Sequence, residues 1–191
     1  LLTFILEDAS KTKYDDLLQK YIINPLKLTN TIIGTKISDT NNEAKSYEYL
    51  NNKYILQPET SMTIPLGAGF LVSTPTDLNT FMNALLNGKI LKTTTVSQMK
   101  TIKETHGFGL FNDKINNETG MGHNGAIDAF MSYAFCFEAT KFCYAVTQNS
   151  NETHLPVVKN NLFNATHNLK INYPKKVISA KIDAKTLAKY T

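Results

Sequence analysis

The residues best suited to chemistry lie in one short stretch, TGMGHNGAID, at residues 119–128. It places a single histidine, His123, among three glycines and directly before an apolar, strand-like run. Imidazole can donate, accept or carry a proton near neutral pH, because the ordinary pKa of histidine is about 6.5. Glycine allows another backbone to approach closely. The stretch is therefore typical of a substrate-facing strand edge, and a turn histidine before a buried strand is the alternative.

The composition indicates one globular domain. The 191 residues are 42% hydrophobic and 19% charged, with a net charge of +4, which suits a chain that can bury a core. All 20 basic residues are lysine. Arginine, the preferred residue for bidentate contacts with bases and phosphates, is absent, so we expect no nucleic-acid partner.

No apolar run approaches the length of about 18 residues that a membrane-spanning helix needs, so membrane association would depend on segments outside this chain. The chain begins without Met on the helical pattern LLTFILEDA, which favours a fragment or a processed chain. The other histidines and the two cysteines do not have the spacing of metal ligands. We expect neither a metal nor a cofactor.

Four segments have the spacing of amphipathic helices, and a fifth is typical of the end of one. The strongest begins at a Thr74 cap, has Pro75 first and Asp77 third, and ends before Gly88. The helix before Pro25 should end there, since a residue that precedes proline disfavours helical angles. Helices are predicted over residues 3–8, 14–24, 75–87, 95–104 and 152–168.

Strand signals separated by turn residues follow the fourth helix. Strands are predicted over residues 106–112, 119–125, 128–137 and 141–149. The polar excursion over residues 31–61 is expected to hold one or two short strands around 44–49 and 53–56.

The last two strands should form a hairpin. A four-residue turn at Glu138–Lys141 would place Phe137 opposite Phe142 and Cys136 opposite Cys143. Opposed Cβ atoms lie about 4.5–5.5 Å apart, slightly wider than most disulfides prefer. Two small buried thiols and a cross-strand disulfide in an oxidising compartment therefore both remain open.

Three stretches, taken in order, resemble a known family. They are YDDLLQKYIINPLKLTNT, GAGFLVSTPTDLNTFMNALLNGKIL, and GFGLF followed by GHNGAIDAFMSYAFCF. Together they resemble the serine β-lactamase-like family of penicillin-recognising enzymes, which includes class C β-lactamases and D-alanyl-D-alanine carboxypeptidases. The resemblance extends over about residues 1–165. It implies an α+β fold, namely part of a β-lactamase/transpeptidase-like domain with an antiparallel sheet and flanking helices.

The resemblance also assigns roles near His123. His123-Asn124-Gly125 is similar to the family's third catalytic motif, Lys-Thr-Gly, in which many class C-like members have His for Lys. His123 would be the catalytic residue of this chain and would help to bind a substrate carboxylate. Asn124, Gly125 and Ala126 would contact the substrate, Gly125 by allowing close approach and the Ala126 N–H as an oxyanion donor.

The family's other two motifs, a Ser-x-x-Lys nucleophile and a Tyr-x-Asn or Ser-x-Asn, are expected upstream of Leu1. Ser10–Lys13 and Ser97–Lys100 have the first spelling in the wrong place, and with so many lysines a chance match is expected. Tyr49-Leu50-Asn51 falls in the polar excursion and is expected to be a solvated loop. The chain alone is therefore expected to be inactive.

The implied function is a serine hydrolase that forms an acyl-enzyme with D-Ala-D-Ala-type peptides or β-lactams. It would act in the bacterial cell envelope, as a periplasmic or secreted protein. An esterase of the same family and a non-catalytic homologue that binds peptidoglycan or a protein partner are the alternatives. Residues 1–170 would be the C-terminal part of the domain and 171–191 a linker towards another. An exposed sheet edge would favour self-association, and residues 61–69 are expected to form a pocket wall.

Overall fold

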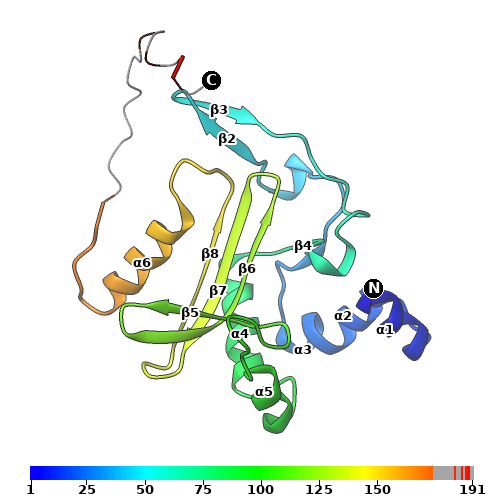
Figure 1. Cartoon of the computed structure of the whole chain (residues 1–191). Coiled ribbons are helices and arrows are strands. Elements are labelled where there is room, and N and C mark those ends of the chain that lie inside the picture. Colours follow the sequence, from blue (N-terminus) through cyan, green and yellow to red (C-terminus); the bar gives the residue numbers. More distant parts are fainter. Residues whose placement is uncertain (174–182, 184–185, 187, 190–191) are drawn as a thin grey trace.

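The computed structural model describes residues 1–173, 183, 186, 188 and 189. Its centre is an antiparallel sheet of four strands in the order β5-β6-β7-β8 (Figure 1). The strands are β5 (Phe111–Ile115), β6 (Glu118–Ile127), β7 (Phe130–Phe137) and β8 (Phe142–Gln148). The α+β fold with an antiparallel sheet and flanking helices is confirmed. The expected linker over residues 171–191 lies mostly outside the described residues.

Each face of the sheet packs against one helix, because successive side chains of a strand point to opposite faces. Phe135 and Phe137 of β7 pack on one face with Phe163 of α6 (Leu155–Thr166). Cys136 packs on the other face with Met82 of α4 (Pro75–Leu86). The sheet therefore lies between two apolar layers.

The β7–β8 hairpin has the expected register. Phe137 pairs with Phe142, Cys136 with Cys143 and Phe135 with Tyr144. Cys136 and Cys143 form a disulfide, which resolves the two alternatives that the sequence left open. The strand predicted over 106–112 begins later, at Phe111, because Gly109 adopts a positive φ of 71° and residues 106–110 form a loop.

The helix predicted to end before Pro25 instead continues past it. It runs as α2 (Tyr14–Leu18), a π-helical turn η1 (Gln19–Ile23) and α3 (Asn24–Leu26), and ends at Lys27 with a positive φ of 54°. The Asn24 N–H donates to the Gln19 carbonyl, five residues back. This wider turn makes room for the proline ring, which in a regular α-helix clashes with the carbonyl four residues earlier.

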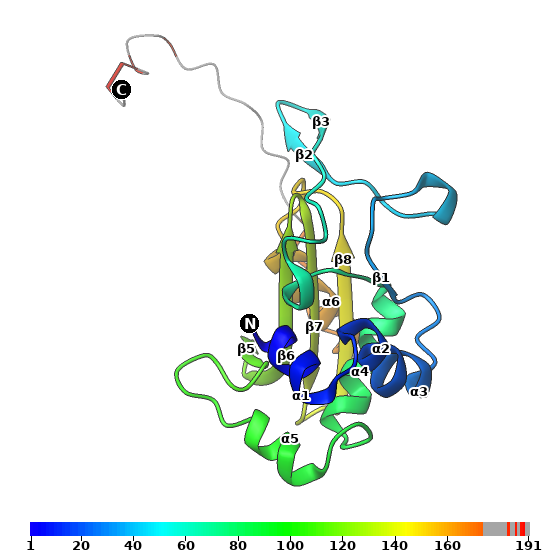
Figure 2. The ribbon, with the colours of Figure 1, turned by 90° about the vertical axis from the view of Figure 1, so that its right-hand side faces the viewer.

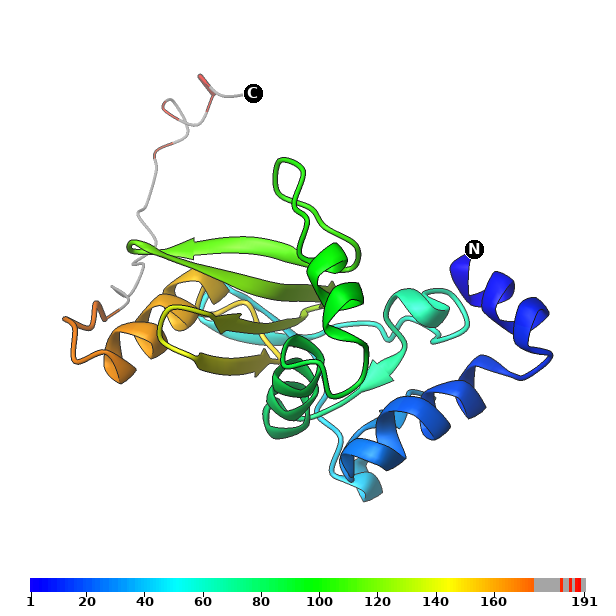
Figure 3. The same cartoon turned by 90° about the horizontal axis from the view of Figure 1, so that it is seen from below.

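Other helices also differ from the predicted bounds, among them α6, which begins at Leu155 rather than at residue 152. The N-terminal helix α1 runs over Leu2–Ser10 and has no buried residue. The helix predicted over 95–104 is α5 (Thr93–Met99), which ends earlier. Figure 3 shows α1, α2 and α3 on the opposite side of the molecule from α6.

The excursion before α4 contains two small sheets and two 3-10 turns. Asn51 and Asn52, with positive φ values of 51° and 61°, turn the chain between β2 and β3, as hairpin turns of the primed type require. This hairpin projects beyond one end of the main sheet (Figure 2). The elements are β1 (Ile32–Ile33), which pairs with β4 (Leu71–Val72), β2 (Tyr47–Leu50), which pairs with β3 (Lys53–Leu56), η2 (Asp39–Asn41) and η3 (Leu66–Ala68).

A buried carboxylate joins the N-terminal segment to α4. Asp77 Oδ2 accepts a hydrogen bond from the Asn30 N–H at 2.9 Å and from the Thr31 hydroxyl at 2.8 Å. The Asp77 N–H donates to the Thr74 hydroxyl, which confirms the predicted cap. Asp77 is 6% exposed, so its charge depends on these partners for compensation.

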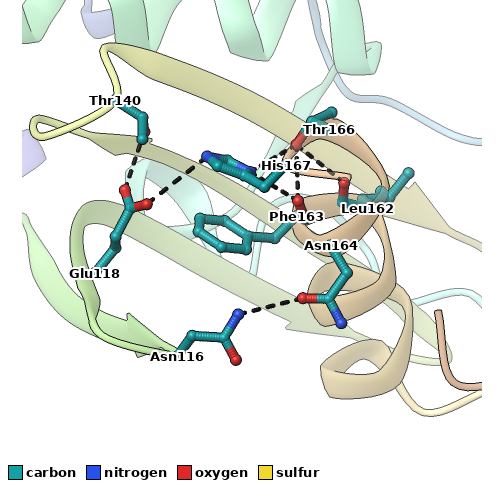
Figure 4. Close-up of polar contacts among 8 residues, drawn as sticks. All are labelled: Asn116, Glu118, Thr140, Leu162, Phe163, Asn164, Thr166 and His167. Carbon is teal, nitrogen blue, oxygen red and sulfur yellow. Dashed lines mark hydrogen bonds and ion pairs between the residues drawn. The ribbon is translucent and has the colours of Figure 1, made fainter. Parts of the chain in front are cut away.

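Polar contacts fasten the end of α6 to the hairpin between β5 and β6 (Figure 4). His167 stacks on Phe163 with ring centroids 4.0 Å apart, and its Nδ1 lies 2.8 Å from the Phe163 carbonyl. Its Nε2 lies 3.7 Å from Glu118, which also accepts a hydrogen bond from Thr140. Three elements distant in sequence are thus held at one corner of the sheet.

Candidate active site

The second half of β6 is an unpaired sheet edge. β5 pairs only with residues 118–122 of β6, whereas β7 pairs with residues 120–127. Within the part of the chain that the structure describes, no strand pairs with residues 123–127 on the β5 side. An extended peptide can add to such an edge as a further strand.

His123 lies where this free edge begins, and its side chain is exposed. Its Nδ1 lies 2.5 Å from the Asn124 carbonyl oxygen. Its ring stacks on Phe111, with centroids 4.2 Å apart and an interplanar angle of 28°. The imidazole is therefore held by one ring face and one nitrogen.

Two glycines allow this edge to lie close to β7. A Cβ at Gly122 would lie 2.1 Å from the Ala134 carbonyl and 2.6 Å from the Phe135 ring, so a side chain there would displace β7. A Cβ at Gly125 would lie 2.6 Å from the Ser132 hydroxyl, which faces it across the pair. Because Gly125 has no side chain, nothing projects from the sheet at this position of the free edge.

The side chain of Asn124 lies on the α6 side of the sheet, opposite to the face on which a Cβ at Gly125 would lie. There it lines a cavity of about 320 Å³ together with Asp113, Tyr133 and Lys159. Tyr133 donates to Asp113 at 2.8 Å, and Lys159 forms an ion pair with the same carboxylate. Burial raises the pKa of the Tyr133 phenol above its ordinary value, and Tyr144 and Asp113 add to the shift. The substrate contact expected of Asn124 stays a prediction.

The excursion reaches the far end of the free edge. Thr60 donates to the Asp128 carboxylate from its hydroxyl at 2.6 Å and from its N–H at 3.1 Å. Asp128 forms the turn after β6, with a positive φ of 53°. The expected pocket wall, residues 61–69, begins next to this anchor. Sequence reasoning missed the anchor, because nothing in the spacing links residues 60 and 128.

The two Ser-x-x-Lys sequences and the Tyr-x-Asn sequence of this chain do not lie at the free edge of β6. Ser10 ends α1 and donates to the Leu6 carbonyl at 2.7 Å. Ser97 is exposed on α5, and Lys100 forms an ion pair with Glu138. Tyr49 lies in β2 of the projecting hairpin. None of these is brought together with His123.

The sequence profile of a family described as beta-lactamase matches residues 1–168. The chain belongs to the beta-lactamase family. This confirms the resemblance drawn from the motifs, and the family and its structural neighbours are hydrolases.

Solved structures agree with this assignment. A D-amino acid amidase from Ochrobactrum anthropi SV3 is 26% identical with a TM-score of 0.68, over 78% of this chain and 47% of that chain. A D-stereospecific amidohydrolase from Streptomyces sp. is 25% identical with a TM-score of 0.66, over 78% and 47%. FmtA from Staphylococcus aureus is 19% identical with a TM-score of 0.70, over 94% and 51%. The chain spans about half the length of these relatives.

No helix among the described residues is long and apolar enough to cross a membrane. No group of three or more metal-ligating side chains occurs among them.

Proposed function

We propose that this chain supplies the substrate-binding edge of a serine hydrolase that acts on amides or peptides built on D-amino acids, or on β-lactams. The observation that carries the proposal is the unpaired half of β6, with His123 at its start and Gly125 within it. Of the relatives named above, one is by its name a D-amino acid amidase and another a D-stereospecific amidohydrolase, which favours this substrate class.

The substrate backbone would pair with residues 123–127 as an additional strand. Gly125 would allow close approach, and the N–H of Ala126 would donate to the carbonyl oxygen as it gains negative charge. A serine hydroxyl from a segment outside this chain would attack that carbonyl and give its proton to a base. The amine would then leave with a proton, and water would hydrolyse the resulting ester.

His123 would bind the substrate carboxylate through the protonated ring. Because a neutral ring binds a carboxylate less tightly than a charged one, the KM of a carboxylate substrate should rise as the pH is raised from about 6 to 8. A His123→Lys variant should flatten that rise. A wild-type KM that stays constant across this range would contradict the role.

The decisive experiment uses the protein translated from the reading frame that contains this chain. We expect hydrolysis of D-amino acid amides in preference to L-isomers, and covalent labelling by a fluorescent penicillin. Gly125→Val should abolish turnover by blocking the free edge, whereas Thr119→Val should retain it, because Thr119 lies in the half of β6 that β5 covers.

The other outcomes identify the alternatives. Hydrolysis of simple esters without penicillin labelling would assign an esterase of the same family. Saturable binding of peptidoglycan stem peptides without turnover would assign a non-catalytic homologue. The proposed place of action is the bacterial cell envelope. We also propose self-association through the free edge, which size-exclusion chromatography at several concentrations would detect.

A further inference from the structure

A row of three aromatic rings ends at His123. His106 contacts Phe111 edge-on, with ring centroids 4.6 Å apart, and Phe111 stacks on His123 at 4.2 Å. Phe111 is the first residue of β5 and pairs with Gly122, which has no side chain to separate the two rings. Isolated bridges join His106 to Lys103 and to Phe111, which fix the loop that carries His106.

The contact of His123 with Asn124 determines which ring nitrogen carries a proton. A carbonyl oxygen can only accept a hydrogen bond, so Nδ1, at 2.5 Å from it, must be the donor. In the neutral ring the single proton is then on Nδ1, and Nε2 keeps its lone pair. No described residue forms a hydrogen bond with Nε2, and the side chain is exposed.

We propose that Phe111 is a positioning residue that holds His123 with Nε2 as the nitrogen that meets the substrate. The Asn124 carbonyl fixes Nδ1, the Phe111 face holds the plane of the imidazole ring, and His106 supports Phe111 from behind. A catalytic use of this positioning rests on the proposed function, whereas the geometry of the rings is independent of it.

The arrangement gives His123 a property that lysine at this position lacks. Charged His123 donates from Nε2, whereas neutral His123 accepts at the same atom without rotating. A lysine ammonium group can only donate. The ring can therefore stabilise a substrate carboxylate in one charge state and accept a proton from the reacting groups in the other, from one fixed position.

The test is the imidazole ¹⁵N spectrum of the 191-residue chain without substrate, at a pH where His123 is neutral. We expect a pyrrole-type shift at Nδ1 and a pyridine-type shift at Nε2. Phe111→Leu should lower the ratio of the Nδ1–H to the Nε2–H form about two- to tenfold, the range that corresponds to losing one aromatic pair. Phe111→Tyr keeps the ring and should restore the wild-type ratio.

The matched control is Phe108→Leu, which removes a phenylalanine that is 73% exposed and lies three residues earlier. It should leave the ratio unchanged. A wild-type spectrum dominated by Nε2–H, or a ratio that Phe111→Leu leaves unchanged in a folded chain, would overturn the proposal. If Phe111→Leu fails to fold, His106→Leu, which should give a smaller change in the same direction, decides the question.

Activity provides a separate readout in the longer protein. His123→Gln places an amide nitrogen near Nε2, and His123→Asn places one near Nδ1. The glutamine variant should have the lower KM for a carboxylate substrate. Equal KM values together with the expected spectra would contradict the catalytic use of Nε2 and leave the positioning intact, whereas failure of the spectra would contradict the positioning itself.

Discussion

Strand β7 and helix α1 are both apolar, but only β7 is buried. The last five residues of β7 are buried between α4 and α6. None of α1 is buried, and Leu2, Phe4 and Ile5 are 75%, 59% and 52% exposed. Hydrophobic periodicity therefore identifies a face that prefers to leave water, but it does not identify what covers that face.

The two regions should differ most in how much stability they lose when a phenylalanine is replaced by alanine. Phe137 is fully buried and packs against Phe163 at 5.0 Å, so Phe137→Ala should lower the free energy of unfolding by about 3–5 kcal/mol. Phe4→Ala should change it by less than about 0.5 kcal/mol, as expected for an exposed site. Urea denaturation measures both, and a comparable loss from the two variants would show that α1 is covered in solution.

Removal of the buried carboxylate that joins the N-terminal segment to α4 should have the next largest effect on stability. Asp77→Ala leaves the Asn30 N–H and the Thr31 hydroxyl without their buried acceptor, and each such hydrogen bond to a charged group contributes about 1.5–3 kcal/mol. We expect a loss of about 3 kcal/mol by urea denaturation. Asp15→Ala, which removes an exposed acid from α2, is the control. If Asp77→Ala costs no more than this control, the N-terminal segment is not held by the carboxylate.

The disulfide should stabilise only the sheet. It closes a loop between residues seven apart in sequence, and the loop-entropy relation gives about 2.5 kcal/mol for a loop of this length. Reduction should therefore lower the free energy of unfolding by about that amount and speed amide exchange in β7 and β8. Exchange in β2 and β3 should stay the same. Faster exchange in both hairpins would indicate one cooperative unit rather than two regions.

The features that the sequence could predict are those set by residues close together in the chain. The β7–β8 register follows from one turn, because a turn at Glu138–Lys141 fixes which residues of the two strands face each other. The α4 cap followed from Thr74, Pro75 and Asp77, which act through local hydrogen bonds. These features depend on residues close together in the chain, and the pattern therefore contained them.

The features that the sequence did not predict depend on partners far apart or on small backbone adjustments. Passing Pro25 required a π-helical turn, which has no side-chain pattern. The stack of Phe111 on His123 depends on where β5 begins, which the sequence pattern did not locate. The motif predicts roles for His123, Asn124, Gly125 and Ala126, and the structure adds the unpaired edge on which they lie. Their roles remain predictions.

The smallest expected effect is alkaline destabilisation of the sheet. Burial raises the pKa values of Tyr133 and Tyr144 in the folded chain above the ordinary value of about 10. The unfolded chain then releases protons that the folded chain retains, so stability is complete below pH 10 and falls above it. At pH 10.5 each tyrosine should lower the free energy of unfolding by about 0.8 kcal/mol relative to pH 8.

Urea denaturation of Tyr133→Phe at both values of pH isolates this effect. The variant loses its hydrogen bond to Asp113 at either pH, so that loss cancels when the two values are subtracted. The remaining pH dependence should be smaller than in the wild-type chain by about 0.8 kcal/mol. Tyr21→Phe, at a position that is 57% exposed, should keep the full pH dependence. An equal reduction in both variants would mean that the Tyr133 phenol is as accessible to water as a tyrosine on the N-terminal helices.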